Sequence, residues 1–145
     1  MQLSRHFSLA EFTRSNTALR LGLSNEPHNA VVLTALANTA RQMERVRGMM
    51  GGGPVHIFSV YRSPALNKAV GGATTSSHLD GEAVDFEVPP HDIANTVAII
   101  RASDLKFDQL IDEFSQWVHI GFGSRMREQV LKARKINGRT VYSPV

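Results

Sequence analysis

Residues 76–86, SSHLDGEAVDF, place a histidine at the end of a loop and an aspartate inside the strand that follows it. Side chains alternate between the two faces of a strand. Val84 and Phe86 share one apolar face, which predicts that this face packs on the core. Asp85 then points away from the core, towards the side from which the loop carrying His78 can return.

Residues 117–122, WVHIGF, repeat this arrangement. Val118, Ile120 and Phe122 alternate with His119, so the histidine is expected on the face opposite the core. Two histidines and one aspartate form a reasonable three-ligand set for zinc and leave a fourth position for water. Such a site lowers the pKa of water from about 15.7 to about 7. The spacing alone leaves open a purely structural role for each histidine.

Working outward, hydrophobic periodicity and turn signals predict the remaining elements. Helices are predicted from Ser8 to about Arg14, from about His28 to Arg47, and from Asp92 to Ala102. Strands are predicted at 55–60, 81–88, 107–114 and 117–122, with a hairpin turn at 137–138 between 130–136 and 139–142. Residues 17–27 and 62–77 are predicted as loops, the second with at most a short helix. This order predicts an α+β fold with a mainly antiparallel sheet and helices packed on one face.

The composition bounds the class of protein. A chain of 145 residues fits one domain, 1–145, and 42% hydrophobic residues exclude disorder as a description of the whole. There are no cysteines, so any metal must be bound by His, Asp or Glu. No apolar run approaches the roughly 20 residues of a membrane span. The start, MQLSRHFSLAEF, lacks the continuous apolar stretch of a secretory signal, which predicts synthesis without export by that route.

The net charge of +3 favours an anionic partner without naming one. Six of the 16 basic residues gather at 125–139 near the C-terminus, and we interpret this run as a solvated face rather than a nucleic-acid site. The other four histidines lack partners at ligand spacing and are predicted to be structural or exposed; they are His6, His28, His56 and His91.

The pattern Ser-x-His-x-x-Gly-x-Ala-x-Asp at 76–85, followed by Trp-Val-His at 117–119, resembles the signature of the zinc D-Ala-D-Ala peptidase family. That family contains bacterial D,D-carboxypeptidases and dipeptidases, phage endolysins that cut L-alanyl-D-glutamate bonds, and a branch related in fold to the hedgehog signalling domain. Residues 60–63, VYRS, resemble its upstream Gly-Tyr-Arg-Ser motif, with valine in the place of glycine. The segments 7–12 and 25–27 resemble the start of the small single-domain members.

The resemblance implies that zinc is bound by His78, Asp85 and His119. It also implies that Arg62 contacts a carboxylate or carbonyl oxygen of the substrate, as a guanidinium can. A structural ion pair is the alternative role for this arginine. Ser76 matches a serine that binds substrate or orients the site, and a hydroxyl that only stabilises the loop is equally compatible.

The general base is less clearly marked. Many relatives carry Glu or Asp three residues before the last zinc histidine, where this chain has Gln116, and a glutamine cannot accept a proton. Glu113, six residues before His119, matches the placement in another branch and is the predicted base, with Asp112 in reserve. Strand alternation does not decide between them, because residues 115–116 can turn the chain.

The sequence thus predicts a zinc peptidase that hydrolyses amide bonds in the peptidoglycan stem peptide or its cross-link. It resembles a phage lysis protein or virion-associated enzyme, acting on the cell wall as a monomer. Trp117 is expected either to stack on substrate or to pack against the strand. Because of Gln116, a non-catalytic phage structural or wall-binding protein that retains the zinc fold is the alternative. The sequence does not distinguish an endopeptidase from a carboxypeptidase. It also does not distinguish cleavage of a D,D bond from cleavage of an L,D bond.

Overall fold

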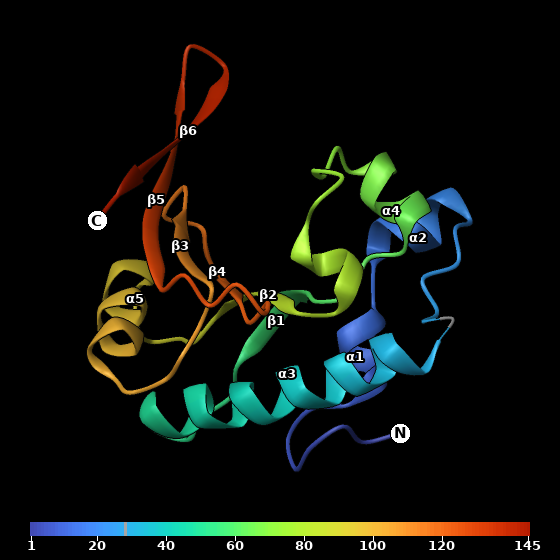
Figure 1. Cartoon of the computed structure of the whole chain (residues 1–145), viewed down its shortest axis with the longest axis horizontal. Coiled ribbons are helices and arrows are strands. Elements are labelled where there is room, and N and C mark those ends of the chain that lie inside the picture. Colours follow the sequence, from blue (N-terminus) through green and yellow to red (C-terminus); the bar gives the residue numbers. More distant parts are fainter. Residues whose placement is uncertain (28) are drawn as a thin grey trace.

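The computed structural model describes residues 1–27 and 29–145, and it contains helices at the N-terminal end followed by strands (Figure 1). The helices are α1 (Leu9–Thr13), α2 (Asn16–Leu21), α3 (Ala30–Met49), α4 (Pro64–Ala69), the 3-10 helix η1 (Ser77–Asp80) and α5 (Ile93–Ala102). The strands are β1 (His56–Ser59), β2 (Ala83–Glu87), β3 (Gln109–Glu113), β4 (Trp117–Gly121), β5 (Gln129–Ile136) and β6 (Arg139–Pro144).

In the described part of the chain the strands form one six-stranded sheet in the order β1-β2-β4-β3-β5-β6. Each neighbouring pair is antiparallel except β3 and β5, which run parallel. The predicted α+β class with a mainly antiparallel sheet is therefore confirmed.

The core lies between one face of this sheet and helices α3 and α5; in Figure 1, α3 runs beneath the sheet and α5 lies to its left. Residues at alternate positions of β2, β3 and β4 are fully buried there, as strand alternation predicted; they are Val84, Phe86, Leu110, Val118 and Ile120. From α3 and α5 the core receives Leu36, Ala40, Met43, Val46, Val97 and Ile100. Burying a large apolar side chain contributes about 1.5–3 kcal/mol, so this packing fixes which sheet face is left for chemistry.

The predicted helices begin at the expected caps. The Ser8 side chain accepts a hydrogen bond from the Glu11 backbone N–H at the start of α1, and Asp92 caps α5 in the same way. The predicted start of the long helix at His28 lies outside the described residues. The helix α3 begins at Ala30 behind an Asn29 cap. It extends to Met49, two residues past the predicted end, and positive φ angles at 51–52 then end it.

The prediction of a loop at 17–27 was wrong, because α2 occupies its first part. The Ser15 side chain accepts from the Ala18 backbone N–H, and Gly22 ends the helix in the left-handed conformation with φ 66°. Only Ala18 is buried, so this short helix shows no hydrophobic periodicity by which the sequence could reveal it. In the second predicted loop, α4 is the short helix that had been allowed for.

The C-terminal hairpin is confirmed. Asn137 and Gly138 both have positive φ, at 50° and 76°, as a two-residue turn between right-twisted strands requires. The hairpin of β5 and β6 extends well beyond the rest of the sheet (Figure 1). Within the described residues, none of the helices has the length and apolar character needed to cross a bilayer.

Candidate metal centre

Three elements bring the predicted ligands together on the sheet face that turns away from the core. Asp85 of β2 and His119 of β4 are direct partners in the antiparallel ladder, so their side chains leave the same face. His78 lies on η1, the helix that immediately precedes β2. This is the group that strand alternation predicted from the sequence.

The ligand atoms of the three residues lie within 4.8 Å of one another. His119 Nδ1 is 2.9 Å from one carboxylate oxygen of Asp85, and His78 Nε2 is 3.2 Å from the other. The two imidazole rings meet edge to face, with 5.3 Å between their centroids. One ion at the centre of this group would be within reach of all three side chains.

The backbone at the two ends of η1 directs this helix towards the sheet. The Ser76 hydroxyl accepts from the His78 backbone N–H at its start, and Gly81 ends it with φ 73°. A Cβ at Gly81 would lie 3.0 Å from the Leu36 side chain, so both the conformation and the space favour glycine. The Thr39 hydroxyl, on α3, donates a hydrogen bond to the Gly81 carbonyl at 2.7 Å and so holds this turn against α3.

His78 is held in one tautomer. Its side chain is buried, and Nδ1 lies 2.6 Å from the backbone carbonyl of Val60. A carbonyl oxygen only accepts, so Nδ1 is the donor of this bond, and Nε2 is the nitrogen that faces Asp85 and can bind a metal. This is the second-shell bond that orients a ligating histidine.

The electrostatics keep Asp85 in its ligating form. Burial alone would raise the pKa of this carboxyl, but the charges and hydrogen bonds of His78 and His119 outweigh burial and hold the pKa well below its usual range. Asp85 is therefore a carboxylate at neutral pH. With two imidazole nitrogens beside it, the donor set fits the N/O ligands that zinc takes at three-ligand sites.

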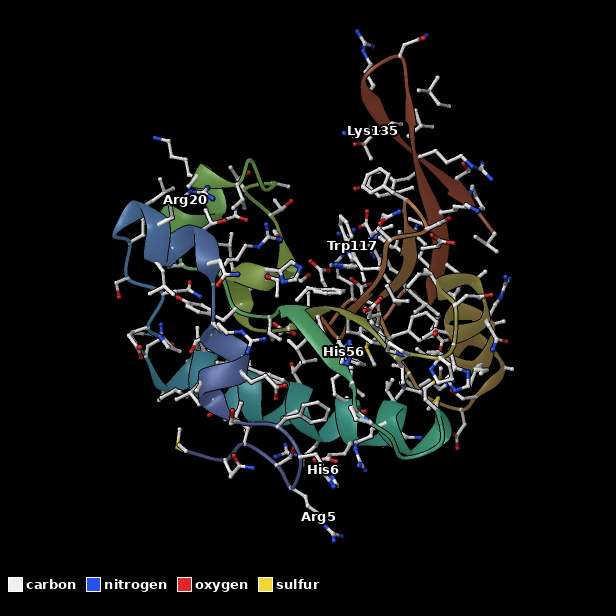
Figure 2. The ribbon with its side chains drawn as sticks, turned by 180° about the vertical axis from the view of Figure 1, so that it is seen from behind. Arg5, His6, Arg20, His56, Trp117 and Lys135 are labelled. Atoms are coloured by element: carbon white, nitrogen blue, oxygen red, sulfur yellow. The ribbon has the colours of Figure 1, made fainter. Side chains whose placement is uncertain are left out.

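These ligands lie in a cavity of about 810 Å³ between the sheet face and residues 71–78. Arg62, Ser76, Glu113 and Trp117 line the same cavity, so the structure brings every sequence-predicted site residue to one place. In Figure 2, Trp117 lies on the side of the sheet that faces the segment after α4.

Arg62 enters the cavity from the segment after β1. Its Nη2 is 3.4 Å from the Ser76 hydroxyl, and its buried Nε has no hydrogen-bond partner among the described residues. Burial lowers the pKa of this guanidinium, while the charge of Asp85 opposes the shift. A Cβ at Gly72 would crowd Arg62 and the Asn67 side chain, so glycine is required for the chain to pass this close.

Asn25 positions the backbone on both sides of Arg62. Its side-chain amide donates to the carbonyls of Thr13 and Tyr61 at 2.8 and 3.0 Å, and its oxygen accepts from the Ser63 N–H at 2.7 Å. Sequence reasoning noted residues 25–27 only as part of a resemblance and missed this positioning role.

Glu113 is the last residue of β3, directly opposite Trp117 on β4. The chain turns after it, at Phe114 and Ser115, which both have positive φ. Because the turn comes after Glu113, side chains alternate between the two sheet faces up to the end of β3. Glu113 therefore lies on the same face as Ile111 and His119, the face that lines the cavity. Burial raises the pKa of this carboxyl; Asp85 and Asp112 add to the shift, and His119 opposes it.

Asp112 points to the other face. Its carboxylate accepts from the Ser115 backbone N–H at 2.8 Å and lies 3.8 Å from Lys132 Nζ, so it stabilises the turn. Gln116 is exposed within the turn itself. Of the three residues considered for the base, Glu113 is the one that lines the cavity.

Of the two roles considered for Trp117, the structure shows the packing, and the predicted stacking on substrate stays a prediction. Its ring packs edge to face against Phe114, with 5.8 Å between centroids, and the half-buried side chain also lines the cavity. Sequence reasoning missed Tyr142, which reaches the cavity from β6. The register of the hairpin against β3 places it there, and no local sequence signal specifies a parallel pairing.

Of the other histidines, those in the described residues form contacts elsewhere. His6 lies 2.7 Å from Glu44, His56 lies 3.3 Å from Glu87, and His91 bonds the Met50 carbonyl at 3.0 Å. The prediction for His28 falls outside the described residues.

A His-Asp-His group in a cavity that also holds a carboxylate and a guanidinium defines the class of site as that of a metal-dependent hydrolase. The sequence profile of the family described as Peptidase M15 matches residues 5–121, and the chain belongs to this family of zinc peptidases. The protein is thus a member of a metallopeptidase family, and its fold agrees with that family. A comparison with curated protein sequences found no match.

Proposed function

We propose that this protein is a zinc-dependent peptidase that hydrolyses amide bonds in the peptidoglycan stem peptide or its cross-link. The observation that carries the proposal is that Glu113 and the His78–Asp85–His119 group line one cavity on the face of the sheet opposite the core. A carboxylate base beside a three-ligand metal group is an arrangement suited to metal-assisted hydrolysis of a peptide bond.

His78, through Nε2, together with Asp85 and His119 would hold the ion. When bound, the metal supplies Lewis-acid activation of the scissile carbonyl and of a water molecule. Glu113 takes the proton of the attacking water at its carboxylate and delivers it to the nitrogen of the leaving amine. Its position at the end of β3 supports this role, since the turn that follows holds the end of the strand in place.

Arg62 binds the substrate. Its guanidinium, which lines the cavity, holds a peptide carboxylate or the scissile carbonyl oxygen. Ser76 orients this guanidinium through its hydroxyl. Trp117 forms an apolar wall beside Glu113 against which the peptide packs.

The substrate class rests on the resemblance to peptidoglycan peptidases and on charge. Residues 122–145 contain six of the 16 basic residues but one of the 13 acidic residues of the chain. A basic segment next to the cavity is compatible with an anionic wall polymer. We place the action of the protein at the cell wall, as a monomeric phage lysis or virion-associated enzyme, because the small members it resembles act there.

Incubation of purified peptidoglycan with zinc-loaded protein, beside a chelator-treated sample, tests the proposal. Mass spectrometry should find new fragments in the zinc-loaded sample alone, and their masses identify the bond that is cut. Binding to the wall without any fragments would instead favour the non-catalytic wall-binding alternative.

A further inference from the structure

The C-terminal hairpin lies outside the residues that match the family, which end at 121. Strand β5 nevertheless pairs with β3 over the whole length of β3, and β6 pairs with β5. The hairpin therefore extends the sheet beyond β3, the strand that carries Glu113, as Figure 1 shows. These two strands can add side chains to the cavity that the matched part of the chain does not contain.

One row of side chains crosses this edge of the sheet. Trp117 on β4 is opposite Glu113 on β3, Glu113 is opposite Ala133 on β5, and Ala133 is opposite Tyr142 on β6. Partners in a row leave the same face, and neighbouring strands are about 4.8 Å apart. Tyr142 is thus about 10 Å from Glu113 along the row, with Trp117 on the other side of that glutamate.

The residue between them is small. Ala133 is fully buried and carries only a methyl group, so it adds little bulk between Glu113 and Tyr142 in this row. Trp117, Glu113 and Tyr142 all line the cavity. An extended peptide in the cavity would contact Trp117 at one end of the row and Tyr142 at the other, and Glu113 lies between these two aromatic side chains.

The phenol of Tyr142 is available to a ligand. Within the described residues its hydroxyl forms no hydrogen bond, and the residue is 52% exposed. Burial of part of the ring, with the charges of Glu113 and Asp85, raises the pKa of Tyr142. The hydroxyl therefore keeps its proton at neutral pH and is a hydrogen-bond donor.

We propose that Tyr142 is a substrate-binding residue of the metal cavity. Its ring packs against the bound peptide opposite Trp117, and its hydroxyl donates a hydrogen bond to a carbonyl or carboxylate oxygen of that peptide. This inference rests on the proposed peptidase function, since it concerns the same site. The hairpin is then the part of the chain that sets substrate affinity beside the base.

The test compares Tyr142→Phe and Tyr142→Ala with Val141→Ala in the zinc-loaded full-length chain. Val141 is the adjacent residue of β6, points to the opposite face and does not line the cavity. With soluble stem peptide as substrate, the loss of one hydrogen bond in Tyr142→Phe should raise KM about three- to tenfold. Loss of the ring as well in Tyr142→Ala should raise KM more than tenfold, while Val141→Ala stays within about twofold. Circular dichroism melting curves verify that all three variants fold.

A binding measurement separates this inference from the proposed function. Trp117 is the single tryptophan of the chain, so its fluorescence reports a peptide entering the cavity. In a Glu113→Gln background, which prevents turnover, adding Tyr142→Ala should weaken the affinity for the stem peptide more than tenfold. Unchanged KM and affinity in the Tyr142 variants of an active enzyme would overturn the inference and leave the function standing. If the wild-type chain hydrolyses nothing, the function fails and binding decides: weaker binding by Tyr142→Ala supports the role of Tyr142, whereas equal or no binding overturns it.

Discussion

Nδ1 of His78 donates a hydrogen bond to the Val60 carbonyl across 2.6 Å, and Nε2 of the same ring faces Asp85. The strand end before Arg62 thus determines which imidazole nitrogen is offered to a metal. Because Arg62 follows two residues later, the side chain proposed to bind substrate and the candidate ligand His78 are positioned by the same piece of backbone. The contact links the two halves of the candidate site.

Replacing His78 with alanine should remove metal binding. The remaining two ligands, Asp85 and His119, leave an incomplete set for zinc, so the zinc content should fall from one per chain to well below half after dialysis. Atomic absorption on the purified protein measures this. His56→Ala is the matched control, because His56 is exposed and lies on β1, away from the group. A His78→Ala protein that retains stoichiometric zinc would contradict the assignment.

Replacing Glu113 with glutamine should leave the zinc content unchanged and lower kcat about 10²–10⁴-fold, the range for loss of a general base. Steady-state kinetics on the bond identified by mass spectrometry provide the measurement. The comparison variant is Asp112→Asn, which should lower the melting temperature through the Ser115 turn while retaining most of kcat. The opposite result, an inactive Asp112→Asn beside an active Glu113→Gln, would assign the base to Asp112.

The pH dependence follows from the pKa of Glu113. A base must be deprotonated to act, so kcat/KM should fall as the pH decreases through that pKa. Burial raises this pKa in the metal-free protein, whereas a bound zinc ion favours the carboxylate and lowers it, so we predict an acid limb that is absent from the residual activity of Glu113→Gln. The profile is measured with zinc content monitored at each pH, so that metal loss is recognised. An acid limb with the same midpoint in the residual activity of Glu113→Gln, with zinc retained, would be inconsistent with Glu113 as the base.

Replacing Asn25 with alanine should destabilise the fold by about 1–3 kcal/mol, because buried backbone groups of Thr13, Tyr61 and Ser63 lose their partner. Chemical denaturation measures the change in the free energy of unfolding. Asn38→Ala, at an exposed position of α3, is the control and should change it by no more than about 0.5 kcal/mol. Equal stability of the two variants would show that Asn25 does not hold the segment around Arg62.

Strand alternation predicted the central part of the site correctly. It put Asp85 and His119 on the face opposite Val84 and Ile120, because a buried apolar face fixes the orientation of every side chain on a strand. The capping signal at Ser8 also predicted a helix start correctly, since it acts within four residues.

Features that depend on tertiary structure were not predictable in the same way. Phe114 and Ser115 adopt positive φ without a glycine, so the sequence did not reveal where β3 ends or that Glu113 is on the cavity face. Tyr142 reaches the site because β5 pairs parallel to β3, and that pairing joins segments far apart in the chain. The helix α2 was missed because it is short and buries only one residue, so its sequence contains no repeating apolar pattern.

The most direct test of the account compares wild-type protein with Glu113→Gln, both loaded with one zinc per chain, on purified peptidoglycan analysed by mass spectrometry. We predict new stem-peptide fragments with the wild-type protein and none with Glu113→Gln over the same time. Fragments of equal yield from both proteins, or none from either with zinc bound, would contradict the claim that Glu113 and the His78–Asp85–His119 group form a peptidase site.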